Sequence, residues 1–182
     1  AQGDLADARR RFEESHDILR RLGAAYPSSA ERQRDVSVSL NRLGDVLVAQ
    51  GDLAGARRRF EESYDIDKRL VAADPSSAER QRDVSVSLNR LGDVLVAQGD
   101  VPGALAAFRK SLAIREALVG RDPANTEWQR DLIVSYVKLS EVSGDKTYVQ
   151  RALEIAEDMQ QRGVLAPRDA WLIDELKRRA AG

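Results

Sequence analysis

The feature that most constrains the fold is an internal repeat with a period of 48 residues. Residues 27–52 recur without change at residues 75–100, and a more divergent third copy keeps the frame, since Phe12, Phe60 and Phe108 are one period apart. A fixed period of this length is typical of repeat arrays, in which each small unit buries its apolar face against its neighbours. The repeat therefore favours an extended array over a single compact core.

Composition indicates what each unit is made of. Aromatic residues make up only 5% of the 182 residues, whereas charged residues make up 32%. Ala, Leu, Arg, Glu and Gln are abundant, and these residues favour helices over strands. We therefore expect an all-α chain.

Each unit reads as two helices. The first begins at a capping box, Ser28–Glu31 or Ser76–Glu79, in which a hydroxyl accepts from a free amide and the Glu reaches back. Its apolar residues recur every three or four positions until Gln50-Gly51-Asp52 ends it; they are Val36, Leu40, Leu43 and Leu47. The second begins at Asp52 as N-cap and ends at Asp74-Pro75. Its inward residues are Leu53, Ala56, Phe60, Ser63, Ile66 and Leu70.

Two glycines fall inside the first helices, where glycine costs about 1 kcal/mol relative to alanine. They are Gly44 and Gly92, one period apart. A packing reason is expected, because a residue without a Cβ atom lets two helices approach closely. We predict that the close approach is to Ala56 and Ala104 of the second helices.

The residues Leu43-Gly44, Leu47, Gly51, Ala56 and Phe60 resemble the tetratricopeptide repeat signature in their spacing, and the next unit repeats them from Leu91 to Phe108. The resemblance implies an α-solenoid, a right-handed superhelix of antiparallel helix pairs. The long unit is similar to the repeats of kinesin light chains and of bacterial multidomain proteins that carry signalling ATPase or protease domains. HEAT and armadillo arrays, with units of roughly 40 to 47 residues, are the structural alternative.

The domain organisation follows from the period. We expect a repeat array over residues 1–162, with units at about 3–50, 51–98 and 99–146 and a last helix, and a C-terminal capping helix over 163–182. The array begins within a repeat, because the tetrapeptide of residues 1–4 recurs at 49–52. In the capping helix, Trp171, Leu172 and Leu176 are predicted to point inward.

Charge and composition argue against several partners. Lys and Arg number 29 against 30 Asp and Glu, so no net field attracts nucleic acid or an anionic membrane. The Arg9–Arg11 and Arg57–Arg59 triplets are each followed by two glutamates, as on a solvated helix face. There is no cysteine and no apolar stretch long enough to span a bilayer. We expect a cytoplasmic protein, and a bacterial one by the resemblance.

No catalytic or metal site is predicted. His16 is the only histidine, and the repeat places Tyr64 and Leu112 at the same position. No set of His, Cys and acidic residues converges as a catalytic or metal site requires. We therefore expect no enzyme activity, no cofactor and no metal ion.

The candidate binding residues form a ladder on the first helix of each unit, spaced so that they share one face. By the resemblance, this face lines the concave surface, and Asn41 and Asn89 stand where relatives hydrogen-bond an extended peptide. Val38, Val86 and Val134 are apolar steps of the ladder. The predicted groove residues are Arg34, Asn41, Asp45, Arg82, Asn89, Asp93, Arg130, Lys138 and Glu141. Internal ion pairs between neighbouring helices are the alternative role for the charged members.

Two functions follow. The first is a scaffold or adaptor segment of a larger protein, which binds a protein or peptide along the concave surface. The alternative is a structural spacer or self-association module linked to a signalling ATPase or protease domain, with an exposed N-terminal helix face as its contact surface.

Overall fold

The computed structural model describes residues 2–181, with the side chains of residues 6–181, so predicted boundaries at Ala1 and Gly182 lie outside the described residues. Between residues 2 and 181 the chain is helical and contains no β-strand. The helices are α1 (Gln2–Ala25), α2 (Ala30–Ala49), α3 (Leu53–Ala73), α4 (Ala78–Ala97), α5 (Val101–Arg121), α6 (Thr126–Ser143), α7 (Lys146–Gln161), the short 3-10 helix η1 (Pro167–Asp169) and α8 (Trp171–Ala181).

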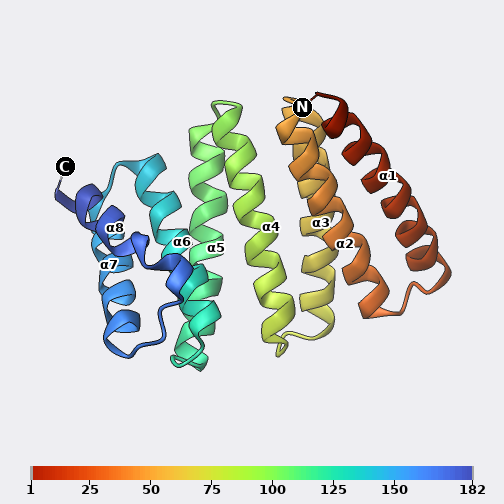
Figure 1. The fold of residues 1–182 in the computed structure, drawn as a ribbon. Helices are drawn as coiled ribbons and strands as arrows, with labels where there is room; N and C mark the ends of the chain where they lie inside the picture. The colour runs from red at the N-terminus through yellow and green to blue at the C-terminus, as the bar shows by residue number, and fades with distance from the viewer. Residues whose placement is uncertain (1, 182) are drawn as a thin grey trace. The chain divides into compact units, whose positions relative to one another are not determined.

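The helices belong to two compact units, Ala1–Ala104 and Leu105–Gly182, with the boundary inside α5. In the first unit, α1 packs against α2, α2 against α3 and α3 against α4. In the second unit, α6 packs against α7 and α7 against α8. Consecutive helices within each unit run antiparallel (Figure 1). The prediction of an all-α solenoid with a C-terminal helix is confirmed.

The predicted apolar faces form the core of the first unit. On α2, the four apolar residues of the stripe are between 1% and 7% exposed. On α3, Ala56, Phe60, Ile66 and Leu70 are buried, while Leu53 is partly buried against the cluster that contains Ala56 and Phe60. The helical spacing in the sequence therefore identified the inward faces of both helices.

The turn between α2 and α3 forms as predicted. Gly51 has a φ of 81°, a left-handed conformation that glycine adopts without a steric cost. Asp52 caps α3, because its Oδ1 accepts a hydrogen bond from the backbone N–H of Gly55 at 2.8 Å. Gly99, one period later, has a φ of 79°.

The capping box prediction was wrong by one residue. The N-cap of α4 is Ser77, whose Oγ accepts from the backbone N–H of Arg80 at 3.3 Å. Glu79 is therefore at the second helical position, from which it does not reach back to Ser76 as predicted; its carboxylate pairs with Arg34 Nη1 at 2.9 Å. Ser29 caps α2 in the same way, by accepting from the backbone N–H of Arg32, so the second serine is the cap in both units.

At Gly44, α2 packs directly against the Phe60 ring of α3. A Cβ atom placed at Gly44 would lie 2.3 Å from Cε1 of Phe60, a distance that no carbon pair tolerates. The prediction of a packing role holds, but the neighbour is the ring of Phe60 rather than Ala56. The missing Cβ leaves the space into which the Phe60 ring packs.

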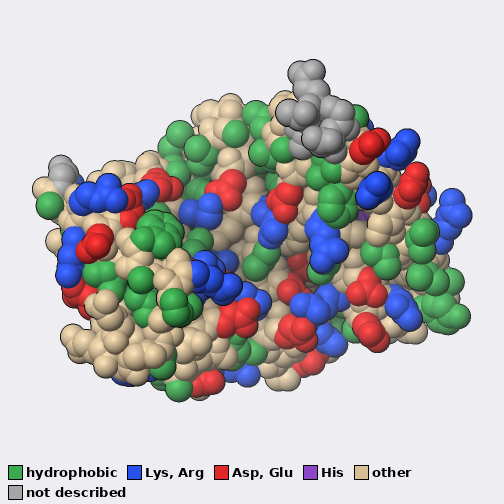
Figure 2. All heavy atoms as spheres, in the orientation of Figure 1, with side chains coloured by type: hydrophobic (Ala, Val, Ile, Leu, Met, Phe, Trp, Pro, Cys, Tyr) green, Lys and Arg blue, Asp and Glu red, His purple; other side chains and the backbone are tan. Residues whose placement is uncertain are grey.

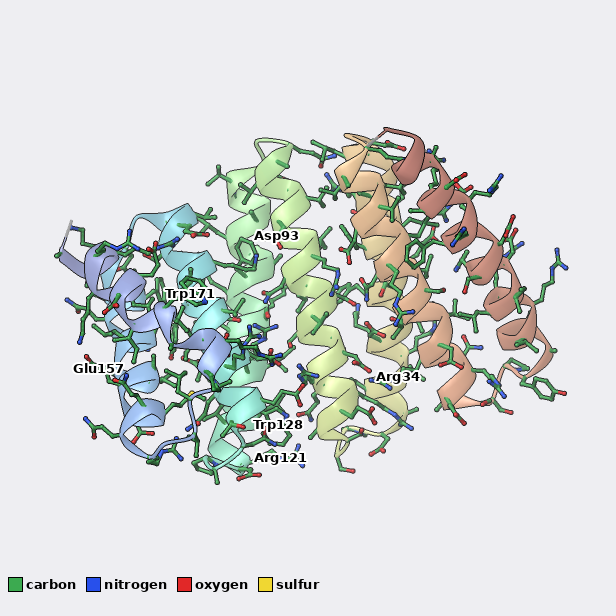
Figure 3. All side chains as sticks on the ribbon, in the orientation of Figure 1. Arg34, Asp93, Arg121, Trp128, Glu157 and Trp171 are labelled. Atoms are coloured by element: carbon green, nitrogen blue, oxygen red, sulfur yellow. The ribbon has the colours of Figure 1, made fainter. Side chains whose placement is uncertain are left out.

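The C-terminal helix differs from the prediction in its orientation. Ile173 and Leu176 are its buried residues, whereas Trp171 is 62% exposed and Leu172 is half-buried. Trp171 lies two residues before Ile173, about 200° around the helix, so both cannot face inward. Trp171 is therefore a surface residue at the start of α8 (Figure 3).

Candidate functional site

In the first unit, four of the eight predicted ladder residues of α2 and α4 line a cavity of about 290 Å³, which we call the first cavity. Val38 and Asn41 line it from α2, and Arg82 and Val86 line it from α4. Asp67 contributes from α3. The remaining lining residues are Ser37, Arg42, Asp83 and Arg90. Residues that are far apart in sequence but equivalent in the repeat are thus brought together.

Asn41 is the unusual residue of this cavity, because it is only 7% exposed and incompletely hydrogen-bonded. Its Nδ2 donates to Ser87 Oγ at 3.2 Å. Its Oδ1 is buried and has no hydrogen-bond partner in the described part of the chain. Buried polar atoms are nearly always paired, so an unpaired one calls for an explanation.

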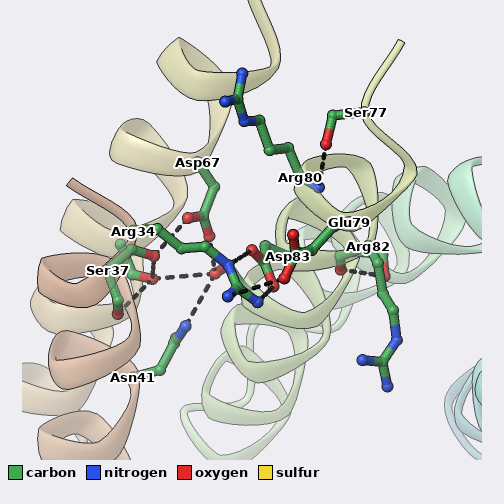
Figure 4. A network of polar contacts seen from close by, with 12 residues as sticks. Arg34, Ser37, Asn41, Asp67, Ser77, Glu79, Arg80, Arg82 and Asp83 are labelled. Atoms are coloured by element: carbon green, nitrogen blue, oxygen red, sulfur yellow. Dashed lines mark hydrogen bonds and ion pairs between the residues drawn. The ribbon is translucent and has the colours of Figure 1, made fainter. Parts of the chain in front are cut away.

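Beneath Asn41 lies a carboxylate that the sequence analysis did not identify. Asp67 is fully buried, and its two oxygens accept from Ser37 Oγ at 2.5 Å and from Ser87 Oγ at 2.6 Å. Ser63 joins the two serines, at 2.8 Å from Ser37 Oγ and 3.1 Å from Ser87 Oγ. Figure 4 shows this network between α2, α3 and α4.

Burial dominates the titration of Asp67. Desolvation raises the pKa of Asp67 to about 6, against the hydrogen bonds from Ser37 and Ser87, which favour the ionised form. Arg34 and Asp83 act on it with opposite signs. A signal in the sequence could have pointed to Asp67: it follows Ser63 by four positions and Phe60 by seven, on the buried stripe of α3.

The charged ladder residues of α2 are held in ion pairs with α4. Arg34 Nε lies 2.5 Å from Asp83 Oδ2, and the guanidinium also contacts Glu79 (Figures 3 and 4). Near the other end of α2, Asp45 accepts from Arg90 Nε at 3.0 Å. These contacts match the internal ion pairs that the sequence analysis kept as an alternative.

The second unit contains a separate cavity of about 230 Å³ between α6 and the C-terminal segment, which we call the second cavity. The ladder residues of α6 line it, namely Arg130, Val134, Lys138 and Glu141. Its walls are mostly apolar and include Ile133, Val137, Trp171 and Leu172. This cavity could accept an apolar side chain.

The charged residues at the second cavity are also paired. Arg130 Nε donates to Asp169 Oδ2 at 2.8 Å, and Asp169 is buried. Glu141 accepts from Arg179 of α8. The ammonium of Lys138 lies 5.7 Å from the centre of the Phe108 ring, within the range of a cation–π contact. The charged side chains at the second cavity are therefore held by contacts within the second unit.

Two predicted groove residues lie on α4 outside the lining of the first cavity. Asn89 is buried at 6% exposure, and Asp93 is exposed (Figure 3). The face visible in Figure 2 is mixed in charge, with positive and negative side chains interspersed. A surface of this kind offers no single-sign patch on that face.

The structure assigns His16 a packing role. Its Nδ1 lies 2.8 Å from Ser39 Oγ, and burial lowers the pKa of the imidazole. Among residues 6–181, no group of three His, Cys, Asp or Glu side chains is arranged to hold a metal ion. None of the described helices is long and apolar enough to cross a membrane.

Comparison with known proteins identifies the repeat. Residues 36–75 and 84–125 match the family model described as tetratricopeptide repeat. No curated protein matches the chain. Each matched segment covers most of two consecutive helices, α2 with α3 and α4 with α5. Repeats of this family generally mediate protein–protein interactions and are typically non-enzymatic scaffolds. These two segments, which span α2 with α3 and α4 with α5, are therefore tetratricopeptide repeats.

Proposed function

We propose that the chain is a scaffold or adaptor segment that binds an extended protein or peptide along the ladder face of α2 and α4. The observation that carries the proposal is the unpaired Oδ1 of buried Asn41 beside the first cavity. A buried acceptor without a partner costs about 1–3 kcal/mol. A backbone N–H of a guest chain would remove that cost after a small movement of the surrounding side chains.

The ion pairs define the role of the other groove residues in this proposal. Because Arg34 and Asp45 are paired with α4, they hold the two helices at a fixed separation and form walls of the groove. In the second unit, Arg130 and Glu141 play the same part beside the apolar second cavity. Arg82, Asn89 and Asp93 complete the proposed surface within the first unit, and Lys138 lines the second cavity within the second unit.

The peptide-binding proposal can be tested with peptides selected from a random displayed library against the wild-type chain. Asn41→Ala with Asn89→Ala should weaken the selected peptides about tenfold or more, because each lost hydrogen bond contributes roughly 1 kcal/mol. Arg58→Ala is the matched control, since Arg58 is exposed on α3 outside the groove. Affinities would be measured by calorimetry, with circular dichroism to verify folding. Unchanged affinity in the double variant would reject the groove assignment.

The second candidate function is self-association through α1. Ile18 of α1 and Tyr26 of the turn that follows α1 are both 59% exposed, which is unusual for large apolar side chains. Sedimentation equilibrium distinguishes the two functions. A concentration-dependent dimer that Ile18→Glu abolishes would favour self-association, whereas a monomer at all concentrations would exclude it.

A further inference from the structure

The hydroxyl protons around Asp67 determine which end of the Asn41 amide contacts Ser87. When Asp67 is ionised, it accepts from both Ser37 and Ser87, so the single proton of each hydroxyl is committed to the carboxylate. Ser87 Oγ can then only accept a further bond. Asn41 must therefore present its Nδ2 to Ser87, and its Oδ1 is the atom left without a partner.

Ser63 does not change this assignment. Its single proton can go to the backbone carbonyl of Ser37 at 3.1 Å, to Ser37 Oγ at 2.8 Å or to Ser87 Oγ at 3.1 Å. In each case the Ser87 proton stays hydrogen-bonded to the ionised Asp67, so Ser87 has none to donate to Asn41. With Asp67 ionised, Ser87 has no hydroxyl proton left to donate to Asn41, and this determines the orientation of the Asn41 amide.

Protonation of Asp67 reverses the direction of the chain of hydrogen bonds. The carboxylic acid gains an O–H that donates to Ser87 Oγ, with the proton coming from solvent. The Ser87 hydroxyl proton is then free to donate to Asn41 Oδ1 once the amide turns by about 180° around its last torsion. Nδ2 moves to the place that Oδ1 occupied, so the amide presents donors where it presented an acceptor.

We propose that Asp67 acts through Ser87 as a positioning residue that selects the hydrogen-bond polarity of Asn41 toward a guest chain. With Asp67 ionised, the groove at Asn41 takes an N–H donor; with Asp67 protonated, it takes a carbonyl acceptor. This inference deepens the proposed peptide-binding function and rests on it for its biological consequence. By linkage, a guest that donates to Asn41 favours release of the Asp67 proton, and a guest that accepts favours its uptake.

The charged groups around Asp67 leave it able to titrate. Arg34 of α2 and Asp83 of α4 act on it with opposite signs, and they pair with each other at 2.5 Å. No cation bonds directly to the Asp67 carboxylate in the described part of the chain, where its two oxygens accept from Ser37 and Ser87. Three further cations line the same cavity, namely Arg42 of α2 with Arg82 and Arg90 of α4.

Nuclear magnetic resonance of the free protein tests the inference without any ligand. The side-chain carbonyl carbon of Asp67 and the side-chain amide signals of Asn41 would be followed between pH 4.5 and 8. We expect both sets to change with one shared midpoint near pH 6. Asn41 signals that stay constant across the Asp67 transition would overturn the proposal.

Two matched serine variants separate the relay from general structural effects. Ser87→Ala and Ser37→Ala each remove one hydrogen bond to Asp67, but only Ser87 contacts Asn41. In Ser87→Ala, Asp67 should still titrate while the Asn41 amide loses its response. In Ser37→Ala, the two groups should still share a midpoint, shifted upward. An Asn41 response that survives in Ser87→Ala, or that disappears equally in both variants, would reject the relay. The peptide-binding proposal would be unaffected, since the Asn41→Ala test addresses it separately.

Discussion

The α2–α3 pair of the first unit and the α6–α7 pair of the second unit pack with different residues at equivalent positions. In the first unit, Gly44 leaves the space that the Phe60 ring fills. Two periods later the repeat places Ser140 at the glycine position and Ala156 at the phenylalanine position, and Ala156 is fully buried. Where the first helix gains a Cβ atom, the second helix has lost its ring. The two positions thus behave as one packing pair.

A second pair of equivalent positions carries buried side chains of opposite charge. Asp67 of the first unit corresponds to Arg115 one period later, and both are buried. Asp67 accepts from Ser87, whereas Arg115 Nη1 donates to Ser135, which is the residue equivalent to Ser87, at 3.0 Å. A serine hydroxyl can donate or accept, so the same position accommodates either charge. The carboxylate can titrate near neutral pH, but the guanidinium cannot.

The largest predicted effect comes from exchanging the packing pair. Gly44→Ser should destabilise the chain by about 1–3 kcal/mol through overpacking against Phe60. Phe60→Ala alone should cost about 3–5 kcal/mol, because it leaves a cavity. The double variant reproduces the pair of the second unit and should cost at least about 1 kcal/mol less than the sum, as measured by urea denaturation. Strictly additive costs would show that the two positions are independent.

The Asp67–Arg115 difference predicts a dependence of stability on pH. Because the folded-state pKa of Asp67, about 6, lies above the ordinary value of 3.8, folding favours the protonated form. The stability that protonated Asp67 contributes to the folded state is fully present below about pH 3.8 and is lost as pH rises through 6. Relative to wild type, Asp67→Asn should therefore become more stable by up to about 3 kcal/mol between pH 3.5 and 7.5.

The control for this prediction is Arg115→Gln in the second unit. The difference in unfolding free energy between Arg115→Gln and wild type should stay constant over the same pH range, since a guanidinium remains charged throughout. Denaturant titrations at several pH values would provide both comparisons. A pH-independent difference for Asp67→Asn would contradict the account of burial given for this carboxylate.

The smallest effects are expected at the interhelical ion pairs. Arg34→Ala and Arg130→Ala remove equivalent arginines from partners of different burial, since the side chain of Asp83 is 20% exposed and that of Asp169 is 9% exposed. Each loss should cost about 1 kcal/mol, with the larger cost at Arg130, because it leaves the more buried carboxylate unpaired. Arg58→Ala should change stability by less than about 0.5 kcal/mol. If Arg34→Ala and Arg130→Ala lower stability equally at every salt concentration, burial of the partner carboxylate does not affect how much the ion pair stabilises the chain.

The sequence predicted the features that depend on local periodicity. The period, the inward stripe of α2 and the glycine turn at Gly51 all follow from spacing and backbone preference, and the structure confirms them. The N-cap was misplaced by one residue, because two adjacent serines offer the same capping hydroxyl. The residue at which α8 begins determines whether Trp171 faces inward. A single aromatic residue in the sequence does not reveal that start, so the inward orientation predicted for Trp171 was wrong.

The candidate site was less predictable, because its chemistry arises between units. Arg34 could have faced a ligand or a neighbour until α4 was placed beside α2, which brought Asp83 into contact. Asp67 was overlooked because aspartate is seldom fully buried, although its spacing from Phe60 and Ser63 places it on the inward stripe of α3. The domain boundaries, the likeness to kinesin light chains, the bacterial origin and the cytoplasmic location stay predictions.

The ion pairs between α2 and α4 carry a consequence for how such a chain can change in length. Arg34 and Asp83 are 49 residues apart, and Asp45 and Arg90 are 45 residues apart, so each pair spans close to one period. Insertion or deletion of a whole period supplies an equivalent partner at the same place, whereas an insertion of a few residues within a helix shifts the residues beyond it out of register with their partners. Growth by complete units is thus the mutational route that keeps the electrostatic links between successive repeats intact.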